Sequence, residues 1–452
     1  MTESSRSESL RQILQRGPAR TAHLLSSLGI SQPTFSRLWA TLADGVVLGA
    51  GKARRYALQR RVAGVETPLP LFRITADGNV ESIGHLNPLE NHFYALTPTS
   101  GTDQYVFEGM PYFLSDLRPQ GFLGRMEPSR HRDLDLPANI LMWRDEHVLK
   151  YIARRGEHGA GDLIAGNESL ARYLAASGVI SAAMIANRQR SKRYPSMAEH
   201  AMQGDAPGSS AGGEQPKFTA TIQRDAEATI IEHVIVKFSP EVHNPSGRRW
   251  GDLLICEHLA LEVLARNGIA AAKTSIIEAG GRLFLEVVRF DRCGLKGRLP
   301  MATFSALDGE VGMLDQNWTV FAGELGRRNA LTEQDVQTVE ILDLYGALIG
   351  NTDRHHGNIA VAWSFTQRHR LLPAYDMLPM FYRPTAQGEI VAREWIPDVG
   401  NRLALRHLAR CYAMARQFWA DVLNAPRISD EFKRDIASRH WDKLQVLDPQ
   451  QG

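Results

Sequence analysis

The sequence predicts an α+β fold built of two lobes, with a small β-rich subdomain before them and a short helical module at the start of the chain. Three observations predict this organisation. A Gly- and Ser-rich segment leads into a β-branched strand over residues 207–238, helical apolar spacing dominates after residue 250, and the opening segment shows leucines at helical spacing before a basic hairpin. A chain of 452 residues, of which 43% are hydrophobic, can form roughly two to four domains with cores of their own.

Residues 1–62 are expected to form a winged helix-turn-helix. Leucines at helical spacing mark two helices, and Gly17 and Gly29 follow them as turn residues. Ser31 is placed to cap a third helix. The apolar stripe of that helix consists of Phe35, Leu38, Trp39 and Leu42. The residues expected to face a DNA major groove are Gln32, Thr34, Ser36 and Arg37, and those expected to meet phosphates in the hairpin are Lys52, Arg54 and Arg55.

The positive charge of the chain is concentrated at this end. Residues 1–61 contain ten Lys and Arg against three Asp and Glu, whereas the whole chain has a formal net charge of only +2. A basic module on a mildly acidic body favours contact with double-stranded DNA, with a homodimer on the DNA as one arrangement. The alternative is a winged helix that serves only protein contact or dimerisation.

The middle of the chain is expected to be β-rich. Short apolar stretches between residues 71 and 107 are separated by Gly, Asn and Pro, which is typical of strands and turns. Two stretches with helical spacing, 138–155 and 168–187, follow, and their residue types indicate no chemistry. The full division that we expect is a winged helix-turn-helix at 1–62, a linker at 63–70, a β-rich subdomain at 71–155, an N-lobe at 156–288 and a helical C-lobe at 289–452.

The expected N-lobe contains the first candidate site. The loop Pro207–Thr219 is rich in Gly and Ser, so its backbone amides can approach phosphate oxygens without Cβ clashes. The following strand carries Lys237 near its end, where the nucleotide-binding lysine of kinases occurs. The helix at 250–266 offers Glu257 and Glu262 as partners for this lysine. A flexible surface loop and a solvated edge charge are the alternatives.

The stretch Gly350–Val361, followed by Asp376, contains the second candidate site. Asp353 and Asn358 lie between a helical pattern and a strand, and a return strand leads to Asp376. This is the polar order of a kinase C-lobe, in which the first Asp orients the accepting hydroxyl while the Asn and the second Asp hold Mg²⁺ against nucleotide phosphates. The alternative is a turn between two strands, because Asn, Asp and Gly are turn formers.

Two histidines in this stretch have separate expectations. His355 could brace the loop or act as a metal ligand or base, and the pattern of kinase catalytic loops favours the brace. His356 is expected to be exposed to solvent.

In this order, the motifs resemble the HipA family of serine/threonine kinase toxins. The segments that carry the resemblance are Ser210-x-x-Gly213-x-Gln215-x-Lys217, Lys237, Arg289-Phe290-Asp291-Arg292, Asn351-Thr352-Asp353-Arg354-His355-x-x-Asn358 and Tyr375-Asp376-x-Leu378. The resemblance covers residues 70–440. A winged helix on the same chain is similar to the YjjJ-type branch of this family.

The resemblance implies an atypical two-lobed protein-kinase fold that uses ATP and Mg²⁺. Asp353 and Lys237 would be catalytic, and Asn358 and Asp376 would hold the metal. The residues that would bind the nucleotide are Ser210, Gly212, Gly213, Gln215, Lys217, Lys237, Glu257, Phe290 and His355. The resemblance further implies growth inhibition and autophosphorylation of Ser210, with Ser209 as its neighbouring rival. Relatives act on aminoacyl-tRNA synthetases, so such an enzyme or another translation factor is the expected kind of substrate.

Two positions depart from the family pattern. Val288 stands where many members have Glu before the Arg-Phe-Asp-Arg run, and Pro216 stiffens the exit of the phosphate loop. Contacts between a kinase hinge and a nucleotide are largely through the main chain, so Val288 bears little on ATP binding.

Several other classes of protein are disfavoured. Cys256, Cys293 and Cys411 are far apart and fit neither a disulfide framework nor a metal motif. No apolar run approaches the length of a membrane span, and the N-terminus lacks the apolar core of a signal peptide. A cytoplasmic protein that is nucleoid-associated when bound to DNA is therefore expected.

The competing hypothesis is a DNA-binding regulator whose kinase-like body is a sensor or an inactive scaffold. An inactive kinase typically lacks at least one of the polar residues that the reaction needs. This chain retains Lys237, Asp353, Asn358 and Asp376.

Overall fold

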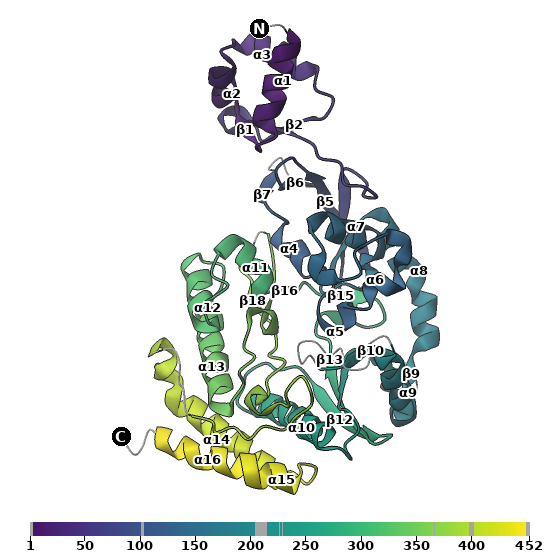
Figure 1. Ribbon diagram of the computed structural model, residues 1–452, viewed down its shortest axis with the longest axis vertical. Coiled ribbons are helices and arrows are strands. Elements are labelled where there is room, and N and C mark those ends of the chain that lie inside the picture. The colour runs from purple at the N-terminus through teal and green to yellow at the C-terminus, as the bar shows by residue number, and fades with distance from the viewer. Residues whose placement is uncertain are drawn as a thin grey trace. The chain divides into compact units, whose positions relative to one another are not determined.

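The computed structural model of the chain describes residues 3–100, 104–203, 215–225, 227, 229–365, 367–396 and 402–448. The chain divides into two compact units, whose elements are labelled in Figure 1. The first unit consists of Met1–Thr75, Asn79–Pro119 and Pro128–Ala176, and the second of Ala76–Gly78, Gln120–Glu127 and Ser177–Gly452. Within the described ranges, no helix is both long enough and apolar enough to span a membrane.

The start of the first unit consists of three helices and a small sheet. Its helices are α1 (Glu3–Leu14), α2 (Thr21–Leu28) and α3 (Gln32–Ala40), and its strands are β1 (Ala19–Arg20), β2 (Gly45–Leu48) and β3 (Arg55–Leu58). The strands form an antiparallel sheet in the order β1-β3-β2. Gly29 ends α2 in the left-handed conformation, as expected for a glycine after a helix. Ser31 occupies the N-cap of α3, although its hydroxyl pairs with the Thr34 hydroxyl (3.1 Å) and not with a backbone amide.

An apolar cluster holds these helices to the small sheet. Its buried members are Leu10, Leu14, Leu24, Leu28, Phe35, Leu38, Leu42, Tyr56 and Leu58. Trp39 lies at the edge of the cluster, partly buried, with its ring 4.7 Å from that of Tyr56. The periodicity of the sequence therefore identified the faces that become buried.

A five-stranded antiparallel sheet follows, in the order β7-β6-β5-β4-β8. Its strands are β4 (Leu69–Ile74), β5 (Val80–Pro88), β6 (Phe93–Pro98), β7 (Tyr105–Glu108) and β8 (Leu163–Ala165). The helices of this region are α4 (Tyr112–Ser115), α6 (Glu127–Arg130), α7 (Asp145–Arg155) and α8 (Asn167–Ala183). The β-rich subdomain expected from the sequence is thus present.

Two boundaries differ from the expectation. Strand β4 begins at Leu69, inside the expected linker, and Leu69 is fully buried. Strand β8 lies beyond residue 155, where the N-lobe was expected to begin, and pairs with β4. A run of three apolar residues is too short to indicate a strand by periodicity, and its partner β4 is distant in sequence. The sequence therefore did not assign β8 to this sheet. The first unit therefore extends to Ala176.

Both faces of the β2–β3 hairpin are packed within the first unit. An apolar cluster joins the hairpin to the five-stranded sheet and contains Leu48, Ala57, Leu89 and Ala95. The amide of Gly49 also donates a hydrogen bond to Gln104 Oε1 (3.0 Å). Arg54 and Arg55 remain exposed. The hairpin is therefore packed on both faces, through Leu48 and Ala57 against the five-stranded sheet and through Tyr56 and Leu58 against the helices, while Arg54 and Arg55 remain exposed.

The second unit begins with a five-stranded sheet in the order β12-β13-β11-β10-β9. Its strands are β9 (Ile185–Ala186), β10 (Lys217–Gln223), β11 (Ile231–Phe238), β12 (Thr274–Ala279) and β13 (Arg282–Val288). All pairs are antiparallel except β9 with β10. Helix α9 (Arg190–Met202) packs against one face through Tyr194 and Ala198, which join Val236 and Phe238 in an apolar cluster.

Helix α10 (Pro245–Arg266) covers the other face of this sheet. It begins five residues earlier than expected, because the Asn244 side chain accepts a hydrogen bond from the Gly247 amide (2.6 Å) and Pro245 fits the first turn. Successive side chains of a strand point to opposite faces. Val236 and Phe238 face α9, so Lys237 between them faces α10.

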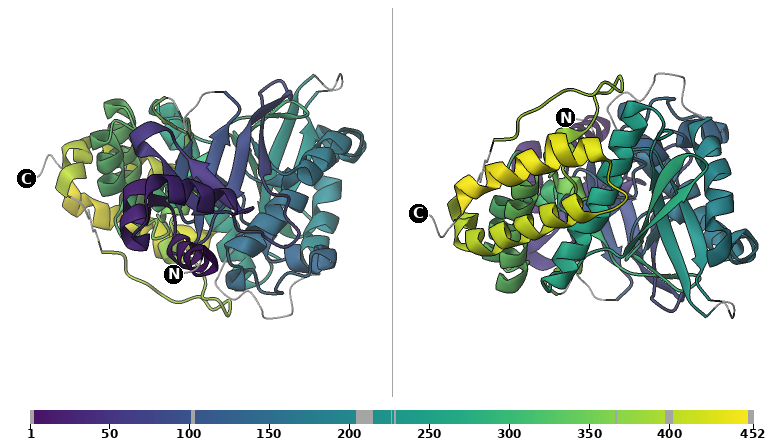
Figure 2. Two further views of the ribbon diagram at one scale, coloured as in Figure 1. Left: turned by 90° about the horizontal axis from the view of Figure 1, so that it is seen from above. Right: turned by 90° about the horizontal axis from the view of Figure 1, so that it is seen from below.

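The rest of the second unit is mainly helical. Its helices are α11 (Phe304–Val311), α12 (Trp318–Arg327), α13 (Glu333–Ile349), α14 (Leu408–Asn424), α15 (Asp430–Phe432) and α16 (Ser438–Leu444), and the short α5 (Gly121–Gly124) also belongs to this unit. The strands β16 (Ala302–Thr303), β17 (Ala360–Ala362) and β18 (Arg370–Leu371) form a small sheet, and β14 (Arg292–Cys293) pairs with β15 (Gly297–Arg298). Figure 2 shows the C-terminal helices in yellow beside α10 in teal.

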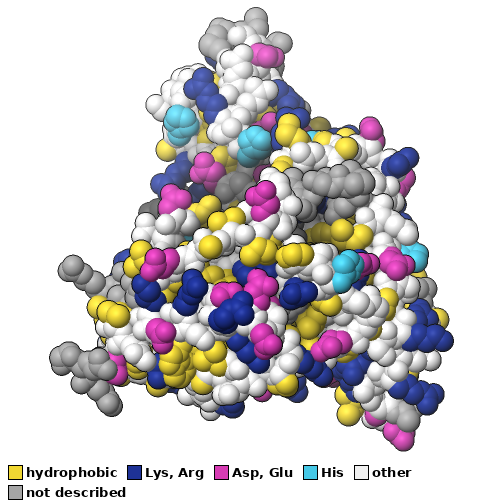
Figure 3. Space-filling model, turned by 60° about the horizontal axis from the view of Figure 1, so that its bottom comes forward, with side chains coloured by type: hydrophobic (Ala, Val, Ile, Leu, Met, Phe, Trp, Pro, Cys, Tyr) yellow, Lys and Arg dark blue, Asp and Glu magenta, His cyan; other side chains and the backbone are white. Residues whose placement is uncertain are grey.

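Charged side chains on this unit are mixed in sign. On the face drawn in Figure 3, Lys and Arg are interspersed with Asp and Glu. Described ion pairs of this unit include Arg266 of α10 with Asp421 of α14, and Arg427, which follows α14, with Glu278 of β12 (3.1 Å). Exposed pairs of this kind contribute little to stability, so the unit is held together mainly by its apolar contacts.

Candidate active site

Lys237 is the centre of a buried charge cluster. Its side chain comes from β11 and is 6% exposed, and its Nζ donates hydrogen bonds to both carboxylate oxygens of Glu257 at 2.7 Å. The same Nζ donates to Asp376 Oδ1. Of the two glutamates that the sequence offered, Glu257 is fully buried beside Lys237, whereas Glu262 is exposed.

The titration of this cluster follows from its burial and its charges. Burial lowers the pKa of Lys237, but the carboxylates of Asp376 and Glu257 outweigh it and hold that pKa above its ordinary value. Burial raises the pKa of Glu257, and the charge of Lys237 only partly offsets it. The pKa of Asp376 is lowered, because Lys237 and Lys217 together outweigh the effect of burial. Lys237 and Asp376 are therefore an ion pair at neutral pH.

Lys217 lies beside this cluster. It is the first residue of β10 and is paired in register with Lys237 of β11, so the two side chains leave the sheet on the same face. Its positive charge acts on both Glu257 and Asp376. The cluster therefore combines two cations with two carboxylates.

Gln215, near the end of the expected phosphate loop, is anchored to β11, the strand that carries Lys237. Gln215 Nε2 donates a hydrogen bond to the carbonyl of Phe238 (2.7 Å), while Gln215 Oε1 is buried and has no hydrogen-bond partner among the described residues. The other loop residues that the sequence singled out, Ser209, Ser210, Gly212 and Gly213, lie outside the described residues.

Asp353 lies on a loop that follows α13. The helix ends at Gly350, whose φ of 81° is the left-handed conformation that favours glycine, and the chain then turns into the loop. Asn351 Oδ1 accepts a hydrogen bond from the Asp353 amide (2.9 Å), and Asn358 Nδ2 donates to the Asp353 carbonyl (2.9 Å). The Asp353 carboxylate is half-buried. The loop is thus fixed by its own side chains and leaves the carboxylate accessible.

Further contacts hold this loop to the helices beneath it. Arg354 Nε donates to Asp343 Oδ1 (2.9 Å), and the other oxygen of Asp343 accepts a hydrogen bond from the Thr319 hydroxyl (2.9 Å). Trp318 Nε1 donates to the carbonyl of His355 (3.0 Å). The Asp343 carboxylate therefore joins α12, α13 and the loop.

The two histidines of the loop lie in different surroundings. His355 is exposed and its Nδ1 accepts a hydrogen bond from the Gly357 amide (3.0 Å), which fits the brace. The expectation that His356 is exposed is wrong, because His356 is only 4% exposed and its ring lies 4.5 Å from that of Phe321. The single turn η6 (His356–Asn358) directs this side chain into the helical core. Burial there lowers the pKa of His356, so the ring is neutral at physiological pH.

Asp376 approaches the cluster from a strained backbone position. Its φ of 52° lies in the left-handed region, which is uncommon for a residue other than glycine. The preceding Tyr375 donates its hydroxyl to the Gly357 carbonyl (2.8 Å), and its ring lies 5.6 Å from that of Phe290. The segment after β18 that carries Asp376 is therefore tied both to the loop of Asp353 and to the segment after β13.

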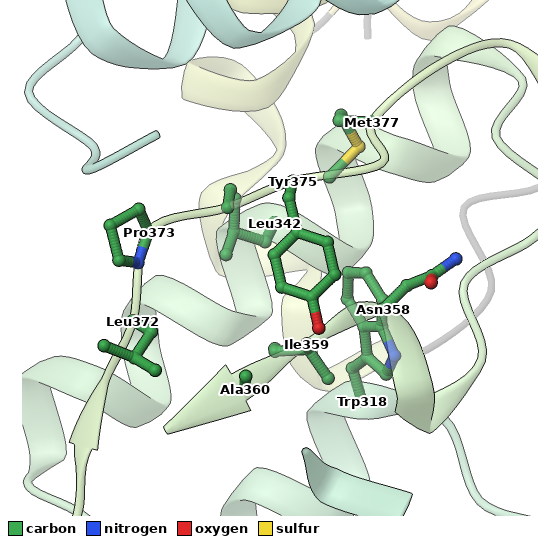
Figure 4. Close-up of a pocket in the computed structure, with 10 residues that line it drawn as sticks. Trp318, Leu342, Asn358, Ile359, Ala360, Leu372, Pro373, Tyr375 and Met377 are labelled. Atoms are coloured by element: carbon green, nitrogen blue, oxygen red, sulfur yellow. The ribbon is translucent and has the colours of Figure 1, made fainter. Parts of the chain in front are cut away.

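A small pocket lies between the segment that follows β18 and the loop of Asp353. Its lining includes Trp318, Leu342, Asn358, Tyr375 and Met377. Figure 4 shows the Tyr375 ring in the middle of the pocket and the Asn358 amide at its edge. The lining is mostly apolar, so the pocket belongs to the packing that supports the loop rather than to a polar binding site.

The residues around Asp376 fit a magnesium ion that is shared with phosphates. Within the described residues, no three His, Cys, Asp or Glu side chains converge as a metal site made of protein alone. Mg²⁺ usually takes one or two carboxylates and completes its shell with water and substrate phosphates. Asp376 supplies a carboxylate, and the hydrogen bond from Tyr375 to Gly357 ties the segment that carries Asp376 to the turn that carries Asn358. This donor set suits Mg²⁺ and lacks the ligands that zinc prefers.

The residues expected to contact DNA lie in the first unit. Gln32, Ser36 and Arg37 of α3 are exposed, and Thr34 is half-buried. The exposed Arg20 of β1 lies directly opposite Arg55 of β3, a pairing that the sequence did not indicate. In the described part of the chain, neither of these arginines has an acidic partner. Like charges opposite one another in a sheet are unfavourable unless an anion lies between them.

Family comparisons agree with this fold. A model described as the HipA-like C-terminal domain matches residues 209–438, and one described as the YjjJ-like toxin middle domain matches residues 65–174. The second unit is therefore a HipA-like, two-lobed kinase fold. Toxin YjjJ of Escherichia coli (strain K12) is 35% identical over 444 residues, which is 97% of this chain and 98% of that protein. The chain belongs to the YjjJ-like branch of the HipA toxin family, and the resemblance seen in its motifs is confirmed.

A solved HipA structure shows a similar fold. HipA of Shewanella oneidensis MR-1, solved as a toxin–antitoxin complex with HipB and its operator DNA, matches with a TM-score of 0.50 at 14% identity, covering 84% of this chain and 97% of that chain. The Helicobacter pylori proinflammatory kinase CtkA matches with a TM-score of 0.37 at 14% identity, covering 53% of this chain and 91% of that chain.

Proposed function

We propose that this protein is an ATP- and Mg²⁺-dependent serine/threonine protein kinase of the HipA toxin type, which inhibits growth and phosphorylates itself. The observation that carries the proposal is the buried Lys237, held between Glu257 of α10 and Asp376. Taking three charged groups out of water has a desolvation cost that ion pairing only partly offsets, so a role in the reaction is a reason for their retention. A strand lysine paired with a helix glutamate is what phosphoryl transfer in protein kinases requires.

Each residue of the site has a role in this mechanism. Asp353 accepts or orients the proton of a serine or threonine hydroxyl, and Asn358 Nδ2, which donates a hydrogen bond to the Asp353 carbonyl, helps to keep it in place. Lys237 neutralises phosphate charge, with Lys217 on the same face as a second cation. Asn358 and Asp376 would hold Mg²⁺, which when bound stabilises the charge that develops on the transferring phosphoryl group.

The phosphate loop and the hinge complete the proposed nucleotide site. Gln215, whose side chain donates a hydrogen bond to the Phe238 carbonyl of β11, would anchor the end of the segment that is proposed to bind the phosphates. Phe290, which packs against Tyr375, is placed on the segment that would contact the adenine. Ser210 is the proposed site of autophosphorylation. A Ser210→Ala protein that still incorporates phosphate, located by mass spectrometry, would move the site to Ser209 or elsewhere.

The first unit is proposed to bind double-stranded DNA. The exposed side chains of α3 provide the groove-facing surface, and the exposed Arg54 and Arg55, with Lys52 in the same hairpin, provide phosphate contacts. Arg20, opposite Arg55, adds a further cation to this surface. A phosphate between these two arginines would relieve their mutual repulsion. The HipA structure with its antitoxin and operator DNA gives a precedent for a DNA-bound relative.

A protein substrate with a serine or threonine hydroxyl completes the proposal, and a translation enzyme such as an aminoacyl-tRNA synthetase is the class that we infer from the family.

A different function, a DNA-binding regulator with an inactive kinase-like body, is favoured only by the basic module at the N-terminus. Expression in a bacterial host separates the two. Growth arrest that disappears in Asp376→Ala is expected for the kinase, whereas operator binding with no difference between wild type and Asp376→Ala would indicate the regulator.

A further inference from the structure

We propose that Asn351 is a positioning residue that fixes Asp353 and Asp376 relative to each other. The inference rests on the proposed kinase function and adds a residue to which no role in the reaction has been assigned. Asn351 is 1% exposed and directly follows Gly350, where α13 ends. Its side-chain amide contacts both halves of the site.

The two ends of this amide have different partners. Asn351 Oδ1 accepts a hydrogen bond from the amide of Asp353 (2.9 Å). Asn351 Nδ2 donates to the carbonyl of Asp376 (3.4 Å) and lies 3.6 Å from the sulfur of Met377. An asparagine side chain offers one acceptor and one donor group at a fixed separation, which neither a carboxylate nor an apolar side chain provides. One buried amide therefore connects the residue proposed to orient the hydroxyl with the residue proposed to hold the metal.

Asp376 needs such a contact. Its left-handed backbone conformation is unfavourable for a residue with a Cβ atom and persists only where the surroundings enforce it. The hydrogen bond from Asn351 holds the carbonyl of Asp376, and so fixes the peptide group that directly follows the Cα atom carrying the carboxylate side chain. Asn351 is itself held in place, because Arg354 donates a hydrogen bond to its carbonyl and also pairs with Asp343 of α13 (2.9 Å).

A purely structural asparagine would satisfy buried polar groups without affecting the reaction. The two roles predict different results. A structural role predicts that loss of the amide lowers stability and leaves the response to Mg²⁺ intact. A positioning role predicts that metal-free nucleotide binding survives, because Lys237 and Glu257 are untouched, while the gain in affinity that Mg²⁺ provides is lost.

The test compares three variants of the full-length chain. Asn351→Leu removes both hydrogen bonds at similar volume, and Asn351→Ser keeps a hydroxyl that is too short to reach both partners. Thr352→Val is the matched control, because Thr352 is the exposed neighbour in the same loop. The affinity of a non-hydrolysable β,γ-imido analogue of ATP is measured by calorimetry with and without Mg²⁺. The rate of phosphate incorporation and the melting temperature are measured alongside.

We expect the substitutions to change the affinity for the analogue in the presence of Mg²⁺ but not in its absence. In Asn351→Leu and Asn351→Ser, metal-free affinity stays within about two-fold of the wild type, while the Mg²⁺-dependent gain and the rate of incorporation each fall roughly ten-fold or more. Thr352→Val behaves as the wild type. If Asn351→Leu does not fold, the measurements on Asn351→Ser test the proposal. A folded variant with a wild-type Mg²⁺ response overturns the proposal. A wild-type protein that neither binds the analogue nor incorporates phosphate refutes the proposed function, and the role of Asn351 falls with it.

Discussion

Replacement of Lys237 by methionine tests the buried cluster through stability. The variant keeps the length and the apolar stem of the side chain and removes its charge. Glu257, which is fully buried, and Asp376 would then face each other without the ammonium that joins them. Removal of one partner from a buried ion pair costs about 3–5 kcal/mol. Because Lys217 acts on both carboxylates, we expect the lower end of this range, about 3 kcal/mol.

Urea unfolding without nucleotide or metal measures this loss. The double variant Lys237→Met/Glu257→Gln should recover most of it, because the uncompensated charge is gone. Lys192→Met, on the exposed face of α9, is the matched control and should change the free energy of unfolding by less than about 0.5 kcal/mol.

The pH dependence of this loss has a defined sign. Burial raises the folded pKa of Glu257 above its unfolded value, so the protonated carboxyl stabilises the folded state at low pH and this contribution is lost as the pH rises through the folded pKa. The deficit of Lys237→Met should therefore shrink as the pH falls from 8 towards 5. A single variant as stable as the wild type, or a double variant no more stable than the single one, would refute this reasoning.

Three further predictions concern other parts of the molecule. Burial raises the pKa of Asp252 to about 6, although Ser429 donates two hydrogen bonds to its carboxylate. The free energy of unfolding should therefore decrease by on the order of 2–3 kcal/mol as the pH rises from about 4 to about 6. Asp252→Asn should abolish this fall in urea unfolding, and an unchanged pH profile would contradict it. Arg55→Gln should weaken binding to duplex DNA and reduce the slope of log K against log salt by about one, measured by fluorescence anisotropy. A slope equal to that of the wild type would remove Arg55 from the phosphate contacts. Glu257→Gln should leave the chain folded, since Asp376 still pairs with Lys237, but lower the rate of phosphate incorporation roughly ten-fold or more. A wild-type rate would show that Glu257 does not position the lysine.

Local patterns in the sequence were enough to predict the elements of the site. Lys237 lies near the end of a β-branched strand, and Asp353, Asn358 and Asp376 follow α13 in the expected order, because strand and helix periodicity depend on neighbours in the chain. The choice between Glu257 and Glu262 was left open by the sequence. Both lie on α10, and only the packing of that helix on the sheet buries Glu257 and exposes Glu262.

Features that depend on distant contacts could not be predicted in this way. His356 is buried because one turn of backbone directs it between Phe304 and Phe321, and residue type gives no signal of that direction. Strand β8 is a run of three apolar residues whose partner β4 lies far away in sequence. The contacts of Asn351 also join segments separated by 25 residues. Its place in the loop motif was visible, but its two partners were not.

The central claim is that Asp353 and the Lys237 cluster transfer phosphate from ATP, and labelled phosphate tests it most directly. Wild-type protein and Asp353→Ala are incubated with γ-labelled ATP and Mg²⁺, and incorporation into the chain is measured together with binding of the β,γ-imido analogue. The account predicts that the wild type becomes labelled, whereas Asp353→Ala binds the analogue with similar affinity and incorporates no label. Equal labelling of the two proteins, or a wild type that binds no nucleotide, would contradict it.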